Sequence, residues 1–273
     1  MSDLTTLILC GRSPRHVYVA NRLCRAGRAL AIVQETGSEW TFKKIAALAK
    51  PKNFACKTAR WLRDRKRYVG GGEAKFFFGK RSPSLDQPEL LVEVPHINHA
   101  EVIALADRLK PDCVLVFGTS LIRGKLLEKG SLGIFNLHGG LSPDYRGADC
   151  TFWALYNGEP EQVGCTLHRI DAGIDTGTLI AHVCPEVREG DDELTLFWRA
   201  VKESAEVYAE LLERLERGEK LGQAQTAKGR LYQVKNRGAK EERRLDERLR
   251  GGMLKGVALP PRVRWFFAEG KAR

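Results

Sequence analysis

The chain has 273 residues, 43% of them hydrophobic and 29% charged, and its formal net charge is +11. This composition favours a soluble globular protein with a sizeable core and excludes a long low-complexity chain. No apolar run reaches the roughly 20 residues that a membrane-spanning helix needs, and residues 1–16 lack the basic region of a signal peptide. The sequence therefore favours a cytoplasmic protein.

The first elements alternate between strand and helix. Residues 6–11 and 30–36 are short apolar runs typical of buried strands, and residues 17–27 between them have helical spacing of apolar side chains. A strand, helix and strand in this order predict a parallel sheet with crossover helices. Only Gly11 lies in the first turn, so the G-x-G-x-x-G fingerprint of dinucleotide-binding proteins is absent.

A basic insertion, residues 43–81, interrupts this alternation. It holds thirteen Lys or Arg and two acids, Asp64 and Glu73. We expect a helix pair broken near Pro51 and a flexible stop at glycines 70–72. Such a surface favours anionic partners, namely nucleic acid, an anionic membrane face or a phosphorylated substrate. The alternatives are a solvated face or a cover over one edge of the sheet.

The alternation resumes after the insertion. We predict strands at 111–118, 132–140, 163–170 and 178–187, and helices at 99–110, 123–131, 150–158 and 191–219, the last capped by Asp191 or Asp192. The predicted fold class is α/β, with an open, mainly parallel, Rossmann-like sheet, helices on both faces and a small C-terminal appendage.

The seven cysteines form no C-x-x-C pair. An unpatterned, odd set indicates reduced thiols, most of them ordinary core residues. The chain also lacks H-E-x-x-H and Walker motifs, so we predict no metal site.

Two polar side chains mark the end of the strand at 132–140. Asn136 and His138 are two residues apart, so they project from the same side of an extended chain, and Gly139 and Gly140 then allow a sharp turn. A later loop, residues 171–177 (DAGIDTG), brings a carboxylate. An amide can stabilise an oxyanion, an imidazole can move a proton and a carboxylate can tune that imidazole, which together suit acyl transfer to nitrogen. Taken alone, the histidine could be structural and the loop an ordinary turn.

The segment FNLHGGLSPDYRG (residues 135–147), followed by DAGIDTG, resembles the signature of the formyltransferases that use 10-formyltetrahydrofolate. That family includes glycinamide ribonucleotide, methionyl-tRNA and amino-sugar enzymes. The resemblance implies Asn136 as the oxyanion donor, His138 as the catalytic histidine and Asp175 as the aspartate that tunes it, with Asp171 as the weaker rival.

The resemblance also implies 10-formyltetrahydrofolate as co-substrate and no metal. The backbone of Ser120, Leu121 and Ile122 falls where the family holds the pterin ring. The other wall of that pocket is the loop 170–175, with Ile170, Asp171, Gly173 and Asp175. Two positions depart from the family pattern, because Gly140 replaces a serine and Ser142 replaces a leucine.

The resemblance divides the chain into a catalytic domain at 1–218, which contains the basic insertion, and an appendage at 219–273. Because that appendage resembles the one in amino-sugar formyltransferases, we expect a nucleotide-linked amino sugar of surface polysaccharide synthesis as the acceptor. Methionyl-tRNA, an amino acid and glycinamide ribonucleotide are alternatives. A rival of another class is a non-catalytic nucleic-acid-binding protein on the same scaffold. A homodimer, and a peripheral position on the inner membrane face through residues 43–81, are left open.

Overall fold

The computed structural model describes residues 2–37, the separate positions 58, 61, 62, 64, 65 and 68, and residues 71–268. The helix pair predicted around Pro51 lies outside these residues, and so does Cys56. The other six cysteines are buried free thiols, as the sequence predicted for most of them.

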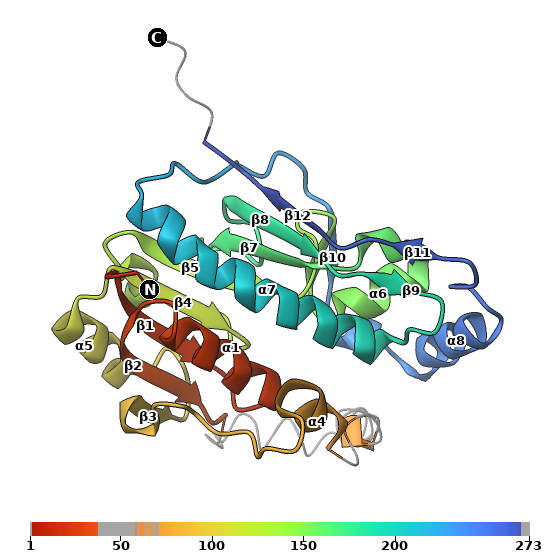
Figure 1. Cartoon of the computed structure of the whole chain (residues 1–273), viewed down its shortest axis with the longest axis horizontal. Helices are drawn as coiled ribbons and strands as arrows, with labels where there is room; N and C mark the ends of the chain where they lie inside the picture. Colours follow the sequence, from red (N-terminus) through yellow and green to blue (C-terminus); the bar gives the residue numbers. More distant parts are fainter. Residues whose placement is uncertain are drawn as a thin grey trace, which may run out of the picture.

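An eight-stranded sheet forms the centre of the molecule, in the order β12-β8-β7-β5-β4-β1-β2-β3 (Figure 1). The strands are β1 (Thr5–Cys10), β2 (Arg28–Glu35), β3 (Leu91–Val94), β4 (Cys113–Phe117), β5 (Gly133–His138), β7 (Cys165–Arg169), β8 (Leu179–Cys184) and β12 (Arg262–Trp265). The five strands from β3 to β5 run parallel, and β7, β8 and β12 are added by antiparallel pairing. The prediction of a mainly parallel sheet is confirmed.

Helices cover both faces of the sheet, as predicted. The α-helices whose bounds lie within the described residues are α1 (Pro14–Cys24), α4 (Gly72–Phe78), α5 (Ala100–Leu109), α6 (Cys150–Asn157), α7 (Glu193–Glu216) and α8 (Ala239–Arg250). One core cluster joins α1, α4 and α7 to one face of the sheet, and a second joins α5 to the other face. Alternate residues of β1, β2 and β4 enter opposite clusters, which explains why these central strands are apolar almost throughout.

The longest helix, α7, begins after Asp192, whose Oδ1 accepts a hydrogen bond from the Thr195 N–H at 2.7 Å. Asp192, rather than Asp191, is therefore the capping residue. In the buried part of α7, the Tyr208 hydroxyl donates to Phe135 O at 2.7 Å and accepts from Val116 N at 2.9 Å. These bonds fix the helix against β4 and β5 and so position the strand that carries Asn136 and His138.

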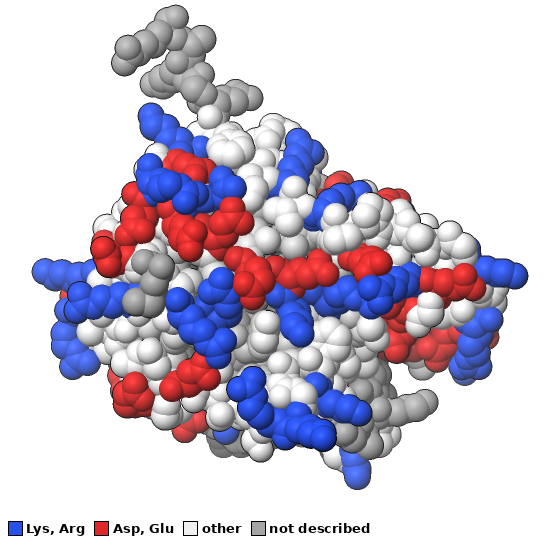
Figure 2. All heavy atoms as spheres, viewed as in Figure 1, with Lys and Arg blue, Asp and Glu red and all other residues white. Residues whose placement is uncertain are grey.

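The end of the basic insertion is packed against the core. Gly71, at φ 68°, precedes α4, so Gly71 and Gly72, predicted as part of a flexible stop, stand at the start of a helix that the sequence did not predict. Within α4, Glu73 is buried and accepts from Arg15 at 2.7 Å, while Phe77 enters the core. On the face in Figure 2, basic and acidic side chains are interspersed rather than gathered into one basic patch.

The remaining elements are short. Two small sheets pair β6 (Tyr145–Gly147) with β10 (Arg230–Tyr232) and β9 (Val187–Arg188) with β11 (Ala258–Leu259). Among the described residues, four 3-10 turns occupy Pro88–Leu90, Gly124–Glu128, Pro160–Gln162 and Val234–Asn236, so the helix predicted at 123–131 is a single 3-10 segment. No helix within the described residues is long and apolar enough to cross a membrane.

The C-terminal residues form part of the sheets. Strand β12 is the edge strand of the central sheet and pairs with β8, and β10 pairs in parallel with β6, a strand that is distant from it in the sequence. The division of the chain at residues 218 and 219 stays a prediction.

Candidate active site

The polar residues of β5 and β7 lie side by side. These strands pair antiparallel with Asn136 opposite His168 and His138 opposite Thr166. The register brings a second imidazole next to Asn136, and the Asn136 Nδ2 and His168 Nε2 atoms are 3.1 Å apart. Sequence reasoning missed His168, because it sits inside an apolar run; the strand register is the only signal that points to it.

Asp175 lies between the two imidazoles. Its Oδ2 is 3.4 Å from His138 Nδ1 and its Oδ1 is 3.5 Å from His168 Nε2. Gly147 N–H donates to Oδ2 at 2.9 Å. We call Asp175, His138 and His168 the carboxylate–imidazole cluster. Its three side chains are at most 13% exposed, so their charges interact through protein rather than bulk water.

Each ring nitrogen of His138 faces a different partner. Nε2 is 3.0 Å from Tyr145 O, and since a carbonyl only accepts, Nε2 carries the proton. Nδ1 therefore receives any second proton, and it faces the Asp175 carboxylate. Burial lowers the pKa of His138 below its usual 6.5, and the Asp175 carboxylate opposes part of that shift.

The Asp175 carboxyl is held ionised. Burial raises its pKa, but the charge interactions with His138 and His168 and the bond from Gly147 N–H together outweigh burial and bring the pKa to about 2. The backbone of Asp175 has φ 52°, in the left-handed region that only Gly, Asn and Asp adopt with ease. The loop conformation is therefore part of how the carboxylate is aimed.

His168 orients Asn136. Its Nδ1 lies 2.8 Å from Arg169 O, so Nδ1 carries the proton in the neutral ring and Nε2 can accept from the Asn136 amide. One amide N–H of Asn136 is used in this contact. The other stays available for an oxygen atom in the site.

The predicted folate loop follows β4. Ser120 N–H is already bonded to Glu35 Oε2 at 2.6 Å, and Leu121 O accepts from Asn98 at 2.9 Å. Ile122 is buried, whereas Leu121 is 36% exposed. Part of the backbone expected to face the pterin is thus used to hold the loop itself.

The second predicted wall divides into structural and exposed positions. Ile170 packs against the core, and the exposed Asp171 carboxylate accepts from Gly173 N at 3.0 Å and Thr176 Oγ1 at 2.7 Å. The Asp171 side chain therefore closes its own loop, whereas that of Asp175 contacts His138. Ile174, at the tip, is 42% exposed.

The departure at Gly140 has a steric cause. A Cβ at this position would lie 2.5 Å from Cys150 Cβ and 2.6 Å from Tyr145 O. The buried Cys150 thiol is also 3.6 Å from His138 Nε2. Cys150 thus occupies the space that a serine at 140 would need. Ser142, the other departure, is buried, and its N–H donates to Thr166 Oγ1 at 2.9 Å.

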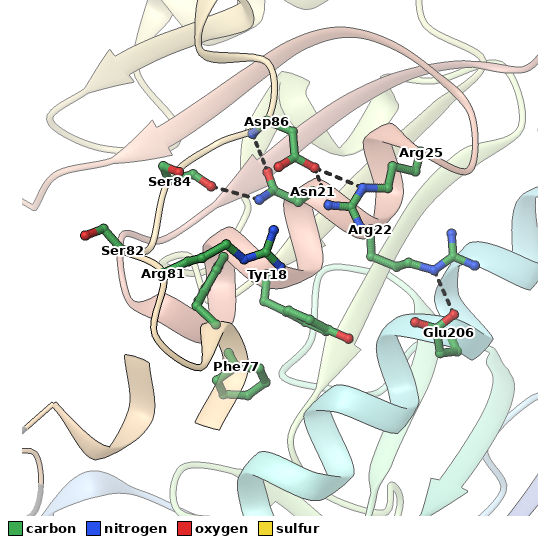
Figure 3. Close-up of a pocket in the computed structure, with 11 residues that line it drawn as sticks. Tyr18, Asn21, Arg22, Arg25, Phe77, Arg81, Ser82, Ser84, Asp86 and Glu206 are labelled. Carbon is green, nitrogen blue, oxygen red and sulfur yellow. Dashed lines mark hydrogen bonds and ion pairs between the residues drawn. The ribbon is translucent and has the colours of Figure 1, made fainter. Parts of the chain in front are cut away.

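A cavity of about 290 Å³ lies elsewhere, between α1, the segment after α4 and α7 (Figure 3). Two of its arginines are paired, Arg22 with Glu206 at 2.7 Å and Arg25 with Asp86. None of its lining residues belongs to the carboxylate–imidazole cluster. Among the described residues, no group of three or more His, Cys, Asp or Glu is arranged to hold a metal ion.

Comparison with known proteins identifies the family. Residues 78–212 match the family model described as formyl transferase. A methionyl-tRNA formyltransferase of Citrifermentans bemidjiense is 31% identical over 191 residues, which cover 66% of this chain and 59% of the relative. The bifunctional polymyxin resistance protein ArnA of Wigglesworthia glossinidia brevipalpis is 33% identical over 126 residues, 46% of this chain and 19% of that protein. The chain therefore spans less than two thirds of these curated relatives.

Solved structures share the fold. A sugar N-formyltransferase of a Shewanella species superposes with a TM-score of 0.56 at 15% identity, covering 90% of this chain and 87% of that one. Glycinamide ribonucleotide transformylase 1 of Symbiobacterium toebii gives a TM-score of 0.52 at 22% identity, with coverages of 80% and 89%. The family model spans both motifs, so residues 78–212 of this chain belong to the formyl transferase family, and the solved structures share its α/β fold.

Proposed function

We propose that the protein transfers a formyl group from 10-formyltetrahydrofolate to a primary amine. The observation that carries this proposal is the Asp175 carboxylate, which lies 3.4 Å from His138 and 3.5 Å from His168 beside the Asn136 amide. An oxyanion donor and a group that can move a proton are the two functions that acyl transfer to nitrogen requires.

Asn136 is the proposed oxyanion donor. When the amine adds to the formyl carbon, the carbonyl oxygen becomes negative, and the Asn136 N–H that is not bonded to His168 can donate to it. Because His168 fixes the amide in advance, this donor needs little reorganisation during the reaction.

His138 and Asp175 are the proposed proton carriers. The amine loses one proton and N10 of the folate gains one, so a group that accepts and returns a single proton is sufficient. His138 Nδ1 is that group, and the Asp175 carboxylate stabilises the imidazolium that forms. Since His138 Nε2 is occupied by Tyr145 O, we assign His138 to proton transfer rather than to the oxyanion.

The pterin ring is proposed to lie between the 120–122 loop and the 170–175 loop. The two loops carry Leu121 and Ile174, large apolar side chains that are 36% and 42% exposed. Exposed aliphatic groups of this kind suit the faces of a flat ring, and the backbone beside them supplies polar contacts to its edge.

For the acceptor we propose a nucleotide-linked amino sugar, because the C-terminal appendage, residues 219–273, resembles the one in amino-sugar formyltransferases. The fold likeness to sugar N-formyltransferases agrees with this choice, while the names of the curated relatives make methionyl-tRNA the second candidate. A cytoplasmic location, a homodimer and contact of residues 43–81 with a membrane stay predictions.

The test is an assay of formyl transfer from 10-formyltetrahydrofolate to three acceptors: a nucleotide-linked amino sugar, methionyl-tRNA and glycinamide ribonucleotide. We expect turnover with the amino sugar, and a loss of about a hundred- to thousandfold in kcat in Asn136→Ala. Calorimetry with a stable folate analogue provides an independent readout. Failure to bind that analogue would contradict the proposal and direct attention to salt-dependent binding of RNA.

A further inference from the structure

The chain beyond α7 contacts two segments of the candidate site, the loop that carries Asp175 and the turn that contains Gly147. Gln225 donates from its side-chain Nε2 to Asp175 O at 3.0 Å and to Gly177 O at 2.7 Å. Strand β10 pairs with β6, which places Tyr232 opposite Gly147, the residue whose N–H holds the Asp175 carboxylate. The C-terminal segment therefore contacts the aspartate loop and the turn that faces it.

The contact at β6 is backbone against backbone. A Cβ at Gly147 would lie 2.1 Å from Tyr232 O, and one at Gly229 would lie 1.7 Å from Pro143 O. The Ala148 N–H also donates to Tyr232 O at 2.9 Å. Only glycine at 147 and 229 permits this approach, so the 143–147 turn is held directly by the C-terminal segment.

The aspartate loop has a matching need for support. Asp175 is one of three non-glycine residues with positive φ among the described residues, and such a conformation persists only when its surroundings hold it. The two carbonyls that Gln225 engages belong to Asp175 and to Gly177, two residues on. The side-chain amide of Gln225 thus holds the backbone that carries the Asp175 carboxylate.

We propose that Gln225 is a positioning residue, which sets the direction of the Asp175 carboxylate toward His138 and His168. This inference rests on the proposed function for its effect on turnover, but not for its effect on geometry. Loss of the Gln225 hydrogen bonds lets the Asp175 loop relax, so the carboxylate moves away from the two imidazoles. A misplacement on the order of 1 Å in a catalytic group costs up to about a hundredfold in rate.

The test compares Gln225→Met with Gln223→Met. The first removes both side-chain hydrogen bonds and keeps the length of the side chain. The second changes an exposed glutamine of the same segment, whose side chain makes no hydrogen bond within the described part of the chain. We expect kcat to fall about ten- to hundredfold in Gln225→Met, with KM for both substrates unchanged, and no change in Gln223→Met.

A second readout does not depend on activity. Titration of His138, followed by NMR of histidine-labelled protein, reports how close the carboxylate lies. The groups facing His138 are Asp175, His168, Cys150 and Arg146. Since the Asp175 carboxylate raises the pKa of His138, Gln225→Met should lower that pKa and Gln223→Met should leave it unchanged.

These readouts separate failure of the inference from failure of the proposed function. A shifted His138 titration in a protein without formyl transfer would support the positioning role and reject the proposed reaction. A wild-type titration in Gln225→Met would overturn the positioning role, whether kcat is retained or falls. A lower thermal midpoint without a shifted titration would show that Gln225 only supports the fold, which also overturns it.

Discussion

Two buried charge clusters in this molecule are built in opposite ways. In the first, Arg237 donates to Asp149 at 3.1 Å, to Glu193 at 2.7 and 2.8 Å and to Glu242 at 2.6 Å, and its guanidinium lies 3.8 Å over the Phe152 ring. We call this group the arginine anchor. In the carboxylate–imidazole cluster, the Asp175 oxygens lie 3.4 and 3.5 Å from nitrogens of the two imidazoles, and His138 Nδ1 can accept a proton.

The difference separates charges that stabilise the fold from charges that we propose take part in proton transfer. The Arg237 side chain is fully buried, and three carboxylates surround it with short bonds, so that it links the segment after α7 to the starts of α6 and α7. The distances in the carboxylate–imidazole cluster are longer, and this cluster contains His138 and Asp175, the two groups that we propose carry the proton. We therefore expect substitutions in the first cluster to change stability and substitutions in the second to change rate.

The largest expected effect is on the arginine anchor. Arg237→Met keeps an apolar stem over Phe152 but removes the cation that bonds Asp149, Glu193 and Glu242. Breaking a buried ion pair in this way costs about 3–5 kcal/mol in the free energy of unfolding. Urea denaturation of wild type and variant measures it, with Arg237→Lys as an intermediate case because a lysine cannot bond bidentately. A loss below about 1 kcal/mol would remove the distinction between the clusters.

The next effect falls on rate. Asp175→Asn preserves shape and tolerates the left-handed backbone at φ 52°, but it removes the charge that stabilises the His138 imidazolium. We expect kcat for formyl transfer to fall at least about a hundredfold, and the unfolding free energy to change far less than in Arg237→Met. If kcat stayed within tenfold of wild type, the assignment of Asp175 would be wrong.

A third effect concerns pH, at His182, a half-buried imidazole outside both clusters. His182 donates from Nε2 to Ser142 O at 2.8 Å, and burial lowers its pKa to about 4. Because the folded pKa is below the unfolded value of 6.5, its contribution to stability is complete above pH 6.5 and is lost as pH falls toward 4. The loss amounts to about 3 kcal/mol. His182→Gln, which retains a donor, should flatten the fall in unfolding free energy between these pH values relative to wild type.

The smallest effect is expected at the surface of α8, in the C-terminal part of the chain. Arg250 and Asp246 form an exposed pair on α8 at 3.7 Å. Since exposed pairs contribute little, Arg250→Gln should leave both the denaturation midpoint and kcat unchanged. A clear loss of stability would show that α8 depends on surface charge, and not on the arginine anchor alone.

Sequence patterns predicted the features that depend on residues close together in the chain. The approximate positions of the central strands, the mainly parallel sheet and a cap at Asp191 or Asp192 follow from apolar runs and turn chemistry within short windows, and the structure selects Asp192. The same windows indicated Asn136, His138 and a carboxylate in the loop 171–177, and the resemblance to the formyltransferases implied Asp175. The structure places Asp175 3.4 Å from His138.

What the sequence did not predict depends on distant pairing. His168 reaches Asn136 only through the antiparallel register of β5 and β7, and Gln225 reaches Asp175 across fifty positions of chain. The edge position of β12 is set in the same way, by pairing with β8. None of these contacts leaves a periodic or compositional mark near the residues involved.

The parallel pairing of β10 with β6 has a consequence for the order in which the protein is made. A nascent chain that has emerged only as far as Glu216 contains Asn136, His138 and Asp175, but neither Gln225 nor Tyr232. The turn at Gly147 and the loop at Asp175 then lack the partners that hold them. Assembly of the site therefore requires residues 225–232 to have emerged. Contacts between such distant residues form late in folding.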